Sequence, residues 1–364
     1  MFALNGDPAP GLVTTQDEFA IAFTEAEIRA NVAAFLETNS EAEARELFRL
    51  CSQNQWNYEN AVQALQTEDW TQQITRILYR PFDLRWTVFN RHVAVHRRER
   101  VMNHMLAGPN IGLVTARANR SPNKDHFLCS RFITEAKTGE STIQSYLLPL
   151  YLYPQNDAAQ AKLIQHQGRV SNLAPKFVAD LTQRLGVQWV DDGAGDLAHT
   201  VGPDDAFHYA YAVFHSPTYR RRYARFLTTD FPRLPLTQNL KLFAQLAAKG
   251  RELTGLHLME APKLENLVTE FPVKGDNIVE KVSYETDNSR VWINAQQYFE
   301  KVPKQTWEFE VGGYQVCEKW LKDRKGRKLS YDDVQHWQKI VVAINETTRL
   351  TKEIDKLIPD WPLP

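Results

Sequence analysis

The period of the hydrophobic pattern changes along this chain, and it limits the elements that each segment can form. Residues 1–75 place apolar side chains at helical spacing behind two capping boxes, Thr24–Glu27 and Ser40–Glu43. After this segment apolar and polar residues alternate in the way that is typical of strands. Apolar residues return to helical spacing in the middle of the chain. Residues 271–316 alternate again, and Ser330 with two aspartates then opens a long helix. The pattern predicts an α+β fold.

We expect this α+β fold to have three parts. Residues 1–75 form a helical N-terminal connector, and residues 76–260 form a mixed α/β-strand region. Residues 261–364 form a β-rich second part with a basic loop and a long C-terminal helix. A chain of 364 residues has the length of two or three domains and can bury a sizeable core.

Short patterns predict the elements of the mixed region. Alternation predicts strands in LRWTVF, HVAVH, IGLVTAR and HFLCSRFITEA. The apolar run SYLLPLYLYP belongs to the core, and its two prolines argue against a central position in a sheet. Helices are predicted for VMNHML, for LAPKFVADLTQRLG with Gly186 at its end, and for two segments separated at Ser216-Pro217.

Composition argues against several classes of protein. The chain has no run of about 18 apolar residues, so we do not expect a membrane span. Its start lacks the basic and apolar regions of a secretory signal. The three cysteines, Cys51, Cys129 and Cys317, form no CxxC pair, which argues against a disulfide framework or a zinc ribbon. We therefore expect a cytoplasmic protein.

Charge is distributed unevenly along the chain. Residues 1–70 carry 12 acidic and 3 basic groups, a net charge of −9, whereas residues 76–137 carry 12 basic and 4 acidic groups, a net charge of +8. Such asymmetry favours a polyanion as the partner of the basic segment. The alternative is that the two segments pack together and neutralise each other.

Signatures of catalysis are weak in this sequence. The phosphate-binding pattern GxxxxGK[ST] does not occur. The segment Asp7-Pro-Ala-Pro-Gly11 resembles the cofactor loop of amino-methyltransferases only faintly, because it lacks the preceding strand and the glycine-rich continuation. The Asn-Pro-Pro-aromatic motif that would hold a flipped adenine is also missing. We therefore expect no catalytic residues in this chain.

One enzymatic alternative is a Mg²⁺-dependent nuclease that uses Asp125, Glu135 and Lys137. Carboxylates on adjacent strands hold Mg²⁺ in many nucleases, with a lysine near the attacking water. The motif is short and common by chance, and the other interpretation is an exposed strand end with an alternating charge pair. His92 and His96 stand four residues apart, but the expected strand would separate them and no third ligand accompanies them. We expect no metal site.

Three basic clusters favour a nucleic-acid partner, because cations along one groove neutralise phosphates and release counterions. They lie in residues 91–124, 220–225 and 319–328. The candidate DNA-binding residues are Arg97, Arg98, Arg100, Arg117, Arg120, Lys124, Arg221, Lys322, Arg324, Lys325, Arg327 and Lys328.

Other side chains could read bases or mediate protein contacts. Asn119, Asn123, Gln296 and Gln297 lie in or near expected loops, and such amides can read adenine. A further alternative is a protein-interaction module, in which the acidic N-terminal segment docks onto a separate methyltransferase or nuclease subunit. That alternative is compatible with DNA binding.

Several long motifs resemble the C-terminal region of type ISP restriction-modification enzymes, which are single-polypeptide type I systems that cut and methylate DNA. The resemblance covers the chain from about Tyr79 to its end and is weaker over residues 13–75. The motifs are YRPFDLRWTVFN, RERVMNHM, NIGLVTAR, SYLLPLYLYP, AFHYAYAVFHSPTYRRRYARFLTTDFPRLPLT and GGYQVCEKWLKDRKGRKLSYDD.

The resemblance implies the function of a specificity domain, which recognises a double-stranded DNA target. The family's nuclease, motor and methyltransferase motifs do not occur here, so the resemblance implies recognition and not catalysis. Full-length relatives use S-adenosylmethionine, ATP and Mg, and we expect no cofactor in this chain. The implied partners are DNA and the methyltransferase and nuclease-motor part of the same system, in cis or in trans.

Matching motif residues receive roles by the same resemblance. The motif Tyr79–Arg85 is expected to form a proline-initiated turn in which Asp83 interacts with Arg85 or with the backbone. Structural roles are also expected for Gly313, Tyr314, Trp320 and Leu321. The basic loop Lys322–Lys328 precedes the final helix and is the best candidate for phosphate contact.

Overall fold

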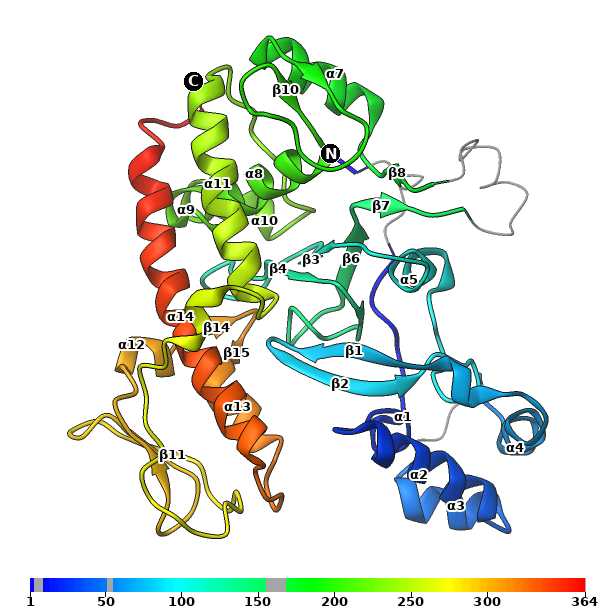
Figure 1. The fold of residues 1–364 in the computed structure, drawn as a ribbon. Helices are drawn as coiled ribbons and strands as arrows, with labels where there is room; N and C mark the ends of the chain where they lie inside the picture. The colour runs from blue at the N-terminus through cyan, green and yellow to red at the C-terminus, as the bar shows by residue number, and fades with distance from the viewer. Residues whose placement is uncertain (3–8, 51–54, 155–167, 364) are drawn as a thin grey trace.

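The chain is represented by a computed structural model that describes residues 1–2, 9–50, 55–154 and 168–363. Figure 1 shows helices of the N-terminal segment at the lower right, small sheets in the middle and long helices at the left. Cys51 and part of the segment Asp7–Gly11 lie outside the described residues. The α+β fold class is confirmed.

The N-terminal head consists of four helices, α1 (Asp17–Ala20), α2 (Glu25–Glu37), α3 (Glu41–Phe48) and α4 (Tyr58–Thr67). Both predicted capping residues start helices. Thr24 Oγ1 accepts a hydrogen bond from Glu27 N at 3.1 Å, and Ser40 Oγ accepts one from Glu43 N at 3.2 Å. Aromatic rings fill a core that is separate from the main one, with the centroids of Phe19 and Phe35 4.7 Å apart.

A β-hairpin follows the head through the short 3₁₀ helix η1 (Trp70–Gln73). Its strands are β1 (Ile74–Arg80) and β2 (Asp83–Val88), and β1 also pairs with β5 (Ile133–Thr134) in parallel. Phe82 occupies the two-residue turn with a φ of 60°. Ala22 and Trp86 exchange backbone hydrogen bonds of 2.9 and 2.8 Å, which attach the head to the hairpin.

A second sheet has the strand order β4-β3-β6. Its strands are β3 (Gly112–Ala116), β4 (Leu128–Ser130) and β6 (Ser145–Pro149). The apolar run beginning at Ser145 therefore forms an edge strand that ends at Pro149, as its prolines predicted. The chain continues into β7 (Tyr151–Leu152), which pairs with β8 (Val170–Ser171).

The predicted strand HVAVH is wrong, because residues 91–95 form turns. Asn90 explains the difference. Its Oδ1 atom accepts a hydrogen bond from His92 N at 2.8 Å, and its carbonyl accepts one from Ala94 N at 2.7 Å. Such asparagine-centred turns compete with strand pairing. The predicted helix after this turn is confirmed as α5 (Glu99–Leu106).

The helical layer begins with α7 (Pro175–Leu185), which ends at Gly186 with a φ of +65° as predicted. Two strands of two residues each, β9 (Gln188–Trp189) and β10 (Thr200–Val201), precede α8 (Pro203–His215). Ser216 ends α8 and caps the next helix, because its Oγ accepts from Tyr219 N at 3.0 Å. The second predicted segment divides into α9 (Pro217–Arg222) and α10 (Ala224–Leu227), and α11 (Leu240–His257) packs on α8.

The C-terminal part combines short strands with helices, as predicted. It contains η2 (Pro262–Glu265), β11 (Ser283–Glu285), β12 (Arg290–Trp292), β13 (Tyr298–Phe299), α12 (Lys304–Trp307), β14 (Glu310–Val311), β15 (Tyr314–Gln315), α13 (Val316–Lys322) and α14 (Tyr331–Leu357). Ser330 and Asp333 form the capping box of α14, in which Ser330 Oγ accepts from Asp333 N at 3.1 Å.

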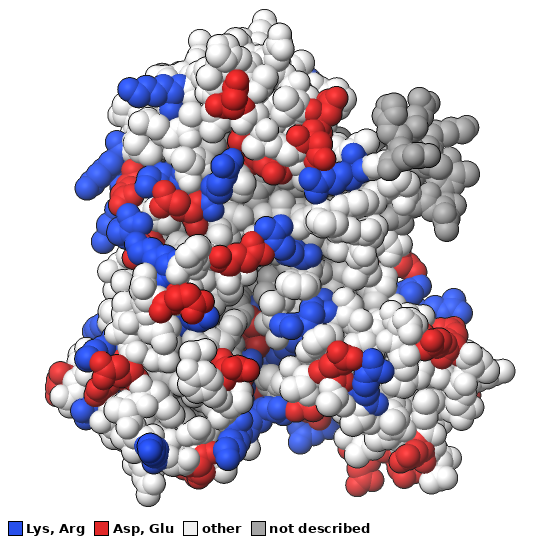
Figure 2. Space-filling view, in the orientation of Figure 1, with Lys and Arg blue, Asp and Glu red and all other residues white. Residues whose placement is uncertain are grey.

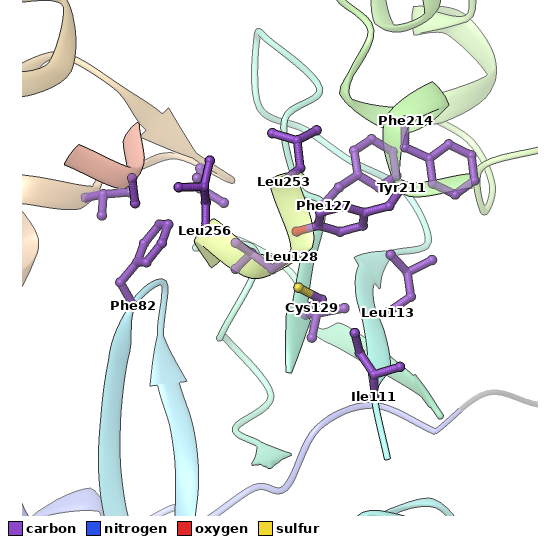
Figure 3. Close-up of a cluster of buried hydrophobic side chains, with 14 of the residues drawn as sticks. Phe82, Ile111, Leu113, Phe127, Leu128, Cys129, Tyr211, Phe214, Leu253 and Leu256 are labelled. Carbon is purple, nitrogen blue, oxygen red and sulfur yellow. The ribbon is translucent and has the colours of Figure 1, made fainter. Parts of the chain in front are cut away.

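The main core is continuous from Leu12 to Leu363 and includes residues on both sides of position 260. Figure 3 shows its centre, where side chains of β4, α8 and α11 meet, and the rings of Phe127 and Phe214 are stacked 4.9 Å apart. The division into three parts stays a prediction. Within the described residues, no helix is long and apolar enough to cross a membrane.

Candidate nucleic-acid interface

The fold joins two of the basic clusters. The loop between β3 and β4 meets the end of α10, where Asn119 N donates to Leu227 O at 2.9 Å. Arg117 Nε lies 3.4 Å from Asp230 Oδ1, and its guanidinium lies 5.9 Å from the ring of Phe231. Five exposed arginines gather on these segments, and we call them the arginine surface: Arg117, Arg120, Arg221, Arg222 and Arg225.

Internal hydrogen bonds hold the loop of the arginine surface. Asn119 Nδ2 donates to Glu140 Oε2 at 2.9 Å, and Ser121 Oγ lies 2.8 Å from Asn119 Oδ1. Lys124 Nζ donates to the carbonyl of Ser121 at 2.8 Å and to that of Asn119 at 3.3 Å. Lys124 is half-buried and supports the loop, whereas Arg120 is exposed.

Two of the four amides considered as base readers are buried, so that interpretation is wrong for them. Asn119 is held by Glu140 as described, and Gln297 Nε2 donates to Val273 O at 3.0 Å. Their exposed fractions are 0% and 1%. Asn123 and Gln296 are exposed, and their role as base readers stays a prediction.

The three arginines before α5 belong to a separate region. Arg97 pairs with Glu99 and donates a hydrogen bond to the carbonyl of Phe89 at 3.2 Å. Its guanidinium also lies over the aromatic ring of Phe89, 5.3 Å from the ring centroid. Arg98 is half-buried at the N-terminus of α5 with a φ of 54°, and Arg100 is exposed. Arg97 thus pairs locally with Glu99.

Arg324 was predicted as a phosphate contact, but it is buried. Its side chain is 8% exposed, and Nη2 donates to Asp83 Oδ1 at 2.9 Å. Arg85 donates to the other oxygen of Asp83 at 2.9 and 2.7 Å, which confirms the expected Asp83–Arg85 interaction. Burial opposes ionisation of Asp83, but Arg324 and Arg85 outweigh it and lower the pKa of Asp83 to about 2. Arg324 therefore holds the hairpin, and a phosphate cannot reach it in this arrangement.

The rest of the basic loop lies nearer to solvent. Arg327 pairs with Glu27 of the head, and its guanidinium lies 4.2 Å from the ring of Phe23. Lys322 pairs with Glu318 at 2.9 Å across one helical turn. Lys325 and Lys328 are exposed. The acidic head thus pairs with Arg327, which lies outside the basic segment 76–137 for which mutual neutralisation was the alternative.

The structural roles expected for the second motif are confirmed. Trp320 and Leu321 are buried, and Gly313 adopts a φ of 82° in the turn between β14 and β15. Tyr314 Oη donates to the carbonyl of Lys137 at 2.9 Å.

The residues of the nuclease alternative have other partners. Glu135 pairs with Arg80 and accepts from Lys137 N at 2.7 Å. Burial raises the pKa of Glu135 in spite of Arg80. Asp125 Oδ1 instead accepts from Gly312 N at 3.0 Å. No group of three or more His, Cys, Asp or Glu side chains within the described part of the chain could hold a metal ion.

The surface is hollowed and mixed in charge on the face that Figure 2 draws. Acidic and basic side chains alternate there, and a hollow lies between the lobe around β11 and the N-terminal head. A cavity beside Asp125 and Arg220 was not foreseen from the sequence. Its walls come from segments more than 200 residues apart, so no local pattern could have indicated it.

The family model described as "Type ISP C-terminal specificity domain" matches residues 6–353. No curated protein matches the chain.

Three solved structures share the fold. The ATP-dependent Type ISP restriction-modification enzyme LlaBIII bound to DNA has a TM-score of 0.70 at 17% identity, over 98% of this chain and 24% of that chain. A nuclease-deletion mutant of the Type ISP enzyme LlaGI, in complex with a DNA substrate mimic, has a TM-score of 0.65 at 19% identity. The match covers 99% of this chain and 34% of that chain. A DrdV–DNA complex has a TM-score of 0.69 at 19% identity, and the match covers 95% of this chain and 36% of that chain. The chain therefore spans about a quarter to a third of these relatives.

Proposed function

The chain belongs to the family of Type ISP C-terminal specificity domains, and on this premise we propose that it recognises a double-stranded DNA target for a restriction-modification enzyme. The arginine surface is the observation that carries the proposal. It assembles five exposed arginines from segments about 100 residues apart, and Arg117 forms an ion pair with Asp230.

Cationic side chains on one surface bind the DNA backbone through phosphate neutralisation and counterion release. Arginine can also make paired hydrogen bonds to guanine in the major groove. The arginine surface therefore offers both backbone contact and base reading. Its rigid support, through Asn119 and Glu140, favours a fixed register on the duplex.

Other candidate residues contribute flanking phosphate contacts in this proposal. Lys322, Lys325 and Lys328 of the basic loop reach solvent, and Arg100 is exposed on α5. Arg97 and Arg327 join them only after their ion pairs loosen, and Arg98 joins them only after its half-buried side chain becomes exposed. Arg324 and Lys124 position their loops instead of touching phosphate.

We assign recognition and no catalysis to this chain. The pairing of Glu135 with Arg80 supports this assignment, because it occupies a carboxylate that the nuclease alternative needs. The chain needs no cofactor of its own in this proposal. Its partners are DNA and the methyltransferase and nuclease-motor part of the system, in cis or in trans, and DNA appears in all three solved complexes.

Fluorescence anisotropy with a labelled 30-base-pair duplex tests the proposal. The chain should bind at about 50 mM salt, and the variant Arg120→Ala/Arg221→Ala/Arg222→Ala should bind at least about tenfold more weakly. The variant Arg29→Ala is the control, because Arg29 is an exposed arginine of the acidic head. Absence of binding to any duplex at low salt would overturn the proposal.

A further inference from the structure

Two connected cavities lie next to the loop of the arginine surface. The inner cavity has a volume of about 240 Å³ and the outer, more open one about 630 Å³. Both are lined by Asp125, Arg220, Gln305 and Phe309. The inner volume is below the range of about 300–1,000 Å³ that is usual for drug-sized ligands. It suits one small ring system that enters through the outer cavity.

Asp125 presents an acceptor to this space. The side chain is 6% exposed, and Oδ1 is fixed by Gly312 N at 3.0 Å and lies 2.9 Å from Ser121 Oγ. Both hydrogen bonds given for this carboxylate go to Oδ1, which leaves Oδ2 as the acceptor for a ligand in the cavity. A ligand with N–H donors would satisfy it.

Arg220 presents donors from the opposite element, α9. Its Nε donates to the carbonyl of Phe214 at 2.9 Å, which fixes the guanidinium. Asp125 and Arg220 line both cavities without forming an ion pair with each other. Burial lowers the pKa of Arg220, and the charge of Asp125 opposes that effect. The two groups thus face one space as a separated acceptor and donor.

Apart from Lys352, the remaining walls of the inner cavity are aromatic or uncharged. Phe82 and Phe127 lie among the core side chains of Figure 3 and line the inner cavity, and Phe309 reaches both cavities. Burial lowers the pKa of His257 to about 3, so its imidazole is neutral near pH 7. A flat ring with a polar edge matches the aromatic walls, and the carboxylate of Asp125 disfavours a phosphate beside it in spite of Arg220 and Lys352.

We propose that this cavity binds a guanine base, with Asp125 accepting its N–H donors and Arg220 donating to its O6 atom. Guanine has adjacent N1–H and N2–H donors beside a carbonyl acceptor, whereas the corresponding edge of adenine has a ring-nitrogen acceptor in place of N1–H. Proteins read an extrahelical base through hydrogen bonds to this edge and contacts with aromatic rings. The same chemistry fits a free guanine nucleotide or an unpaired guanine of DNA. Only the second source rests on the proposed DNA binding.

Calorimetric titration of the full chain with GMP, AMP and CMP tests the inference. GMP should bind, and AMP and CMP should bind at least about tenfold more weakly. No heat from GMP at millimolar concentration, or equal affinities for the three nucleotides, would overturn it.

The variant Asp125→Asn separates recognition from folding. Its amide presents an N–H in place of the carboxylate oxygen, so GMP affinity should fall by about tenfold or more, and affinity for xanthosine monophosphate should rise. A destabilised variant would lose affinity for both, and its unfolding temperature would show this. Asp180→Asn, on the exposed face of α7, is the control and should leave both affinities unchanged. An Asp125→Asn variant that is folded and keeps its GMP affinity would contradict the assignment.

A second arm distinguishes the two sources of guanine. A duplex with one bulged guanine is compared with the same duplex carrying a bulged thymine. Tighter binding of the guanine bulge, lost on Asp125→Asn, supports a DNA base. Equal binding of the two duplexes together with GMP binding supports a free nucleotide. Failure of all duplexes with retained GMP binding would overturn only the proposed function.

Discussion

Arg324 donates a hydrogen bond of 2.9 Å to Asp83, a residue that precedes it by 241 positions. The contact joins the β1–β2 hairpin to the loop before α14, and Arg85 completes it from the other side of the carboxylate. The guanidinium of Arg324 also lies 3.3 Å from the ring of Trp320. A buried carboxylate shared by two arginines therefore fixes the position of the basic loop.

The variant Asp83→Asn should lose about 3–5 kcal/mol of unfolding free energy, because it leaves two buried guanidinium groups with only the more distant carboxylates of Asp323 and Asp333, at 3.2 and 3.9 Å. Urea denaturation followed by tryptophan fluorescence measures the loss. Asp69→Asn, at an exposed position, should change the free energy by no more than about 0.5 kcal/mol. Equal small effects for the two variants would show that the ion cluster does not support the fold.

The crossing of α8 and α11 depends on Gly250. A Cβ atom there would lie 1.8 Å from the carbonyl oxygen of His208, so Gly250→Ala should destabilise the protein by about 1–3 kcal/mol. Gly255 lies in the same helix with its nearest Cβ contact at 3.6 Å. Gly255→Ala should be neutral or stabilising by up to about 1 kcal/mol, because alanine favours helices. The same denaturation assay compares them, and a neutral Gly250→Ala would refute the close crossing.

Buried histidines should make stability fall at acidic pH. Burial lowers the pKa to about 4 for His104 and to about 3 for His126 and His257, with Arg220 adding to the effect at the latter two. The unfolded chain takes up protons below about pH 6.5, whereas the folded chain does not until pH 3–4. Each of these histidines should therefore lower the free energy of unfolding by about 1.4 kcal/mol for each unit that the pH falls within that window.

Thermal unfolding between pH 7.5 and 5 measures this dependence. The slope should become shallower in His104→Gln than in the parent chain. His199→Gln is the control, since the side chain of His199 is 87% exposed. A slope that both variants share would assign the acid sensitivity to other groups.

We expect Glu27 to compete with DNA for Arg327. Because the pair joins two partly exposed side chains, the variant Glu27→Gln should free Arg327 and raise duplex affinity a few-fold at low salt. The control is Glu25→Gln, which removes an acid that pairs with Arg29 within α2. Anisotropy titrations of both variants decide the point. Equal gains would indicate only the loss of a negative charge from the head.

Local signals in the sequence predicted most helices. Ser330 and Gly186 bound their helices because capping depends on residues three or four positions away. The pattern failed at HVAVH because the side chain of Asn90 forms the turn. The alternation of apolar and polar residues does not reveal such hydrogen bonds between a side chain and the nearby backbone.

The candidate site was predictable only in outline. Charge clusters identified the arginines of the exposed surface, but they also selected Arg324, whose partner Asp83 is distant in sequence. The meeting of Asn119 with Leu227 likewise depends on the packing of the whole chain. Burial and long-range pairing decide which cation faces solvent, and composition carries no information about either.

The most direct test of the central claim is the salt dependence of duplex binding. Anisotropy titrations between 50 and 200 mM salt give the slope of log affinity against log salt concentration, which is about −0.9 for each phosphate contact. The variant Arg120→Ala/Arg221→Ala/Arg222→Ala should have a slope shallower by about two to three units than the parent chain, while Arg29→Ala keeps the parent slope. Identical slopes for all three proteins would show that the arginine surface does not contact DNA.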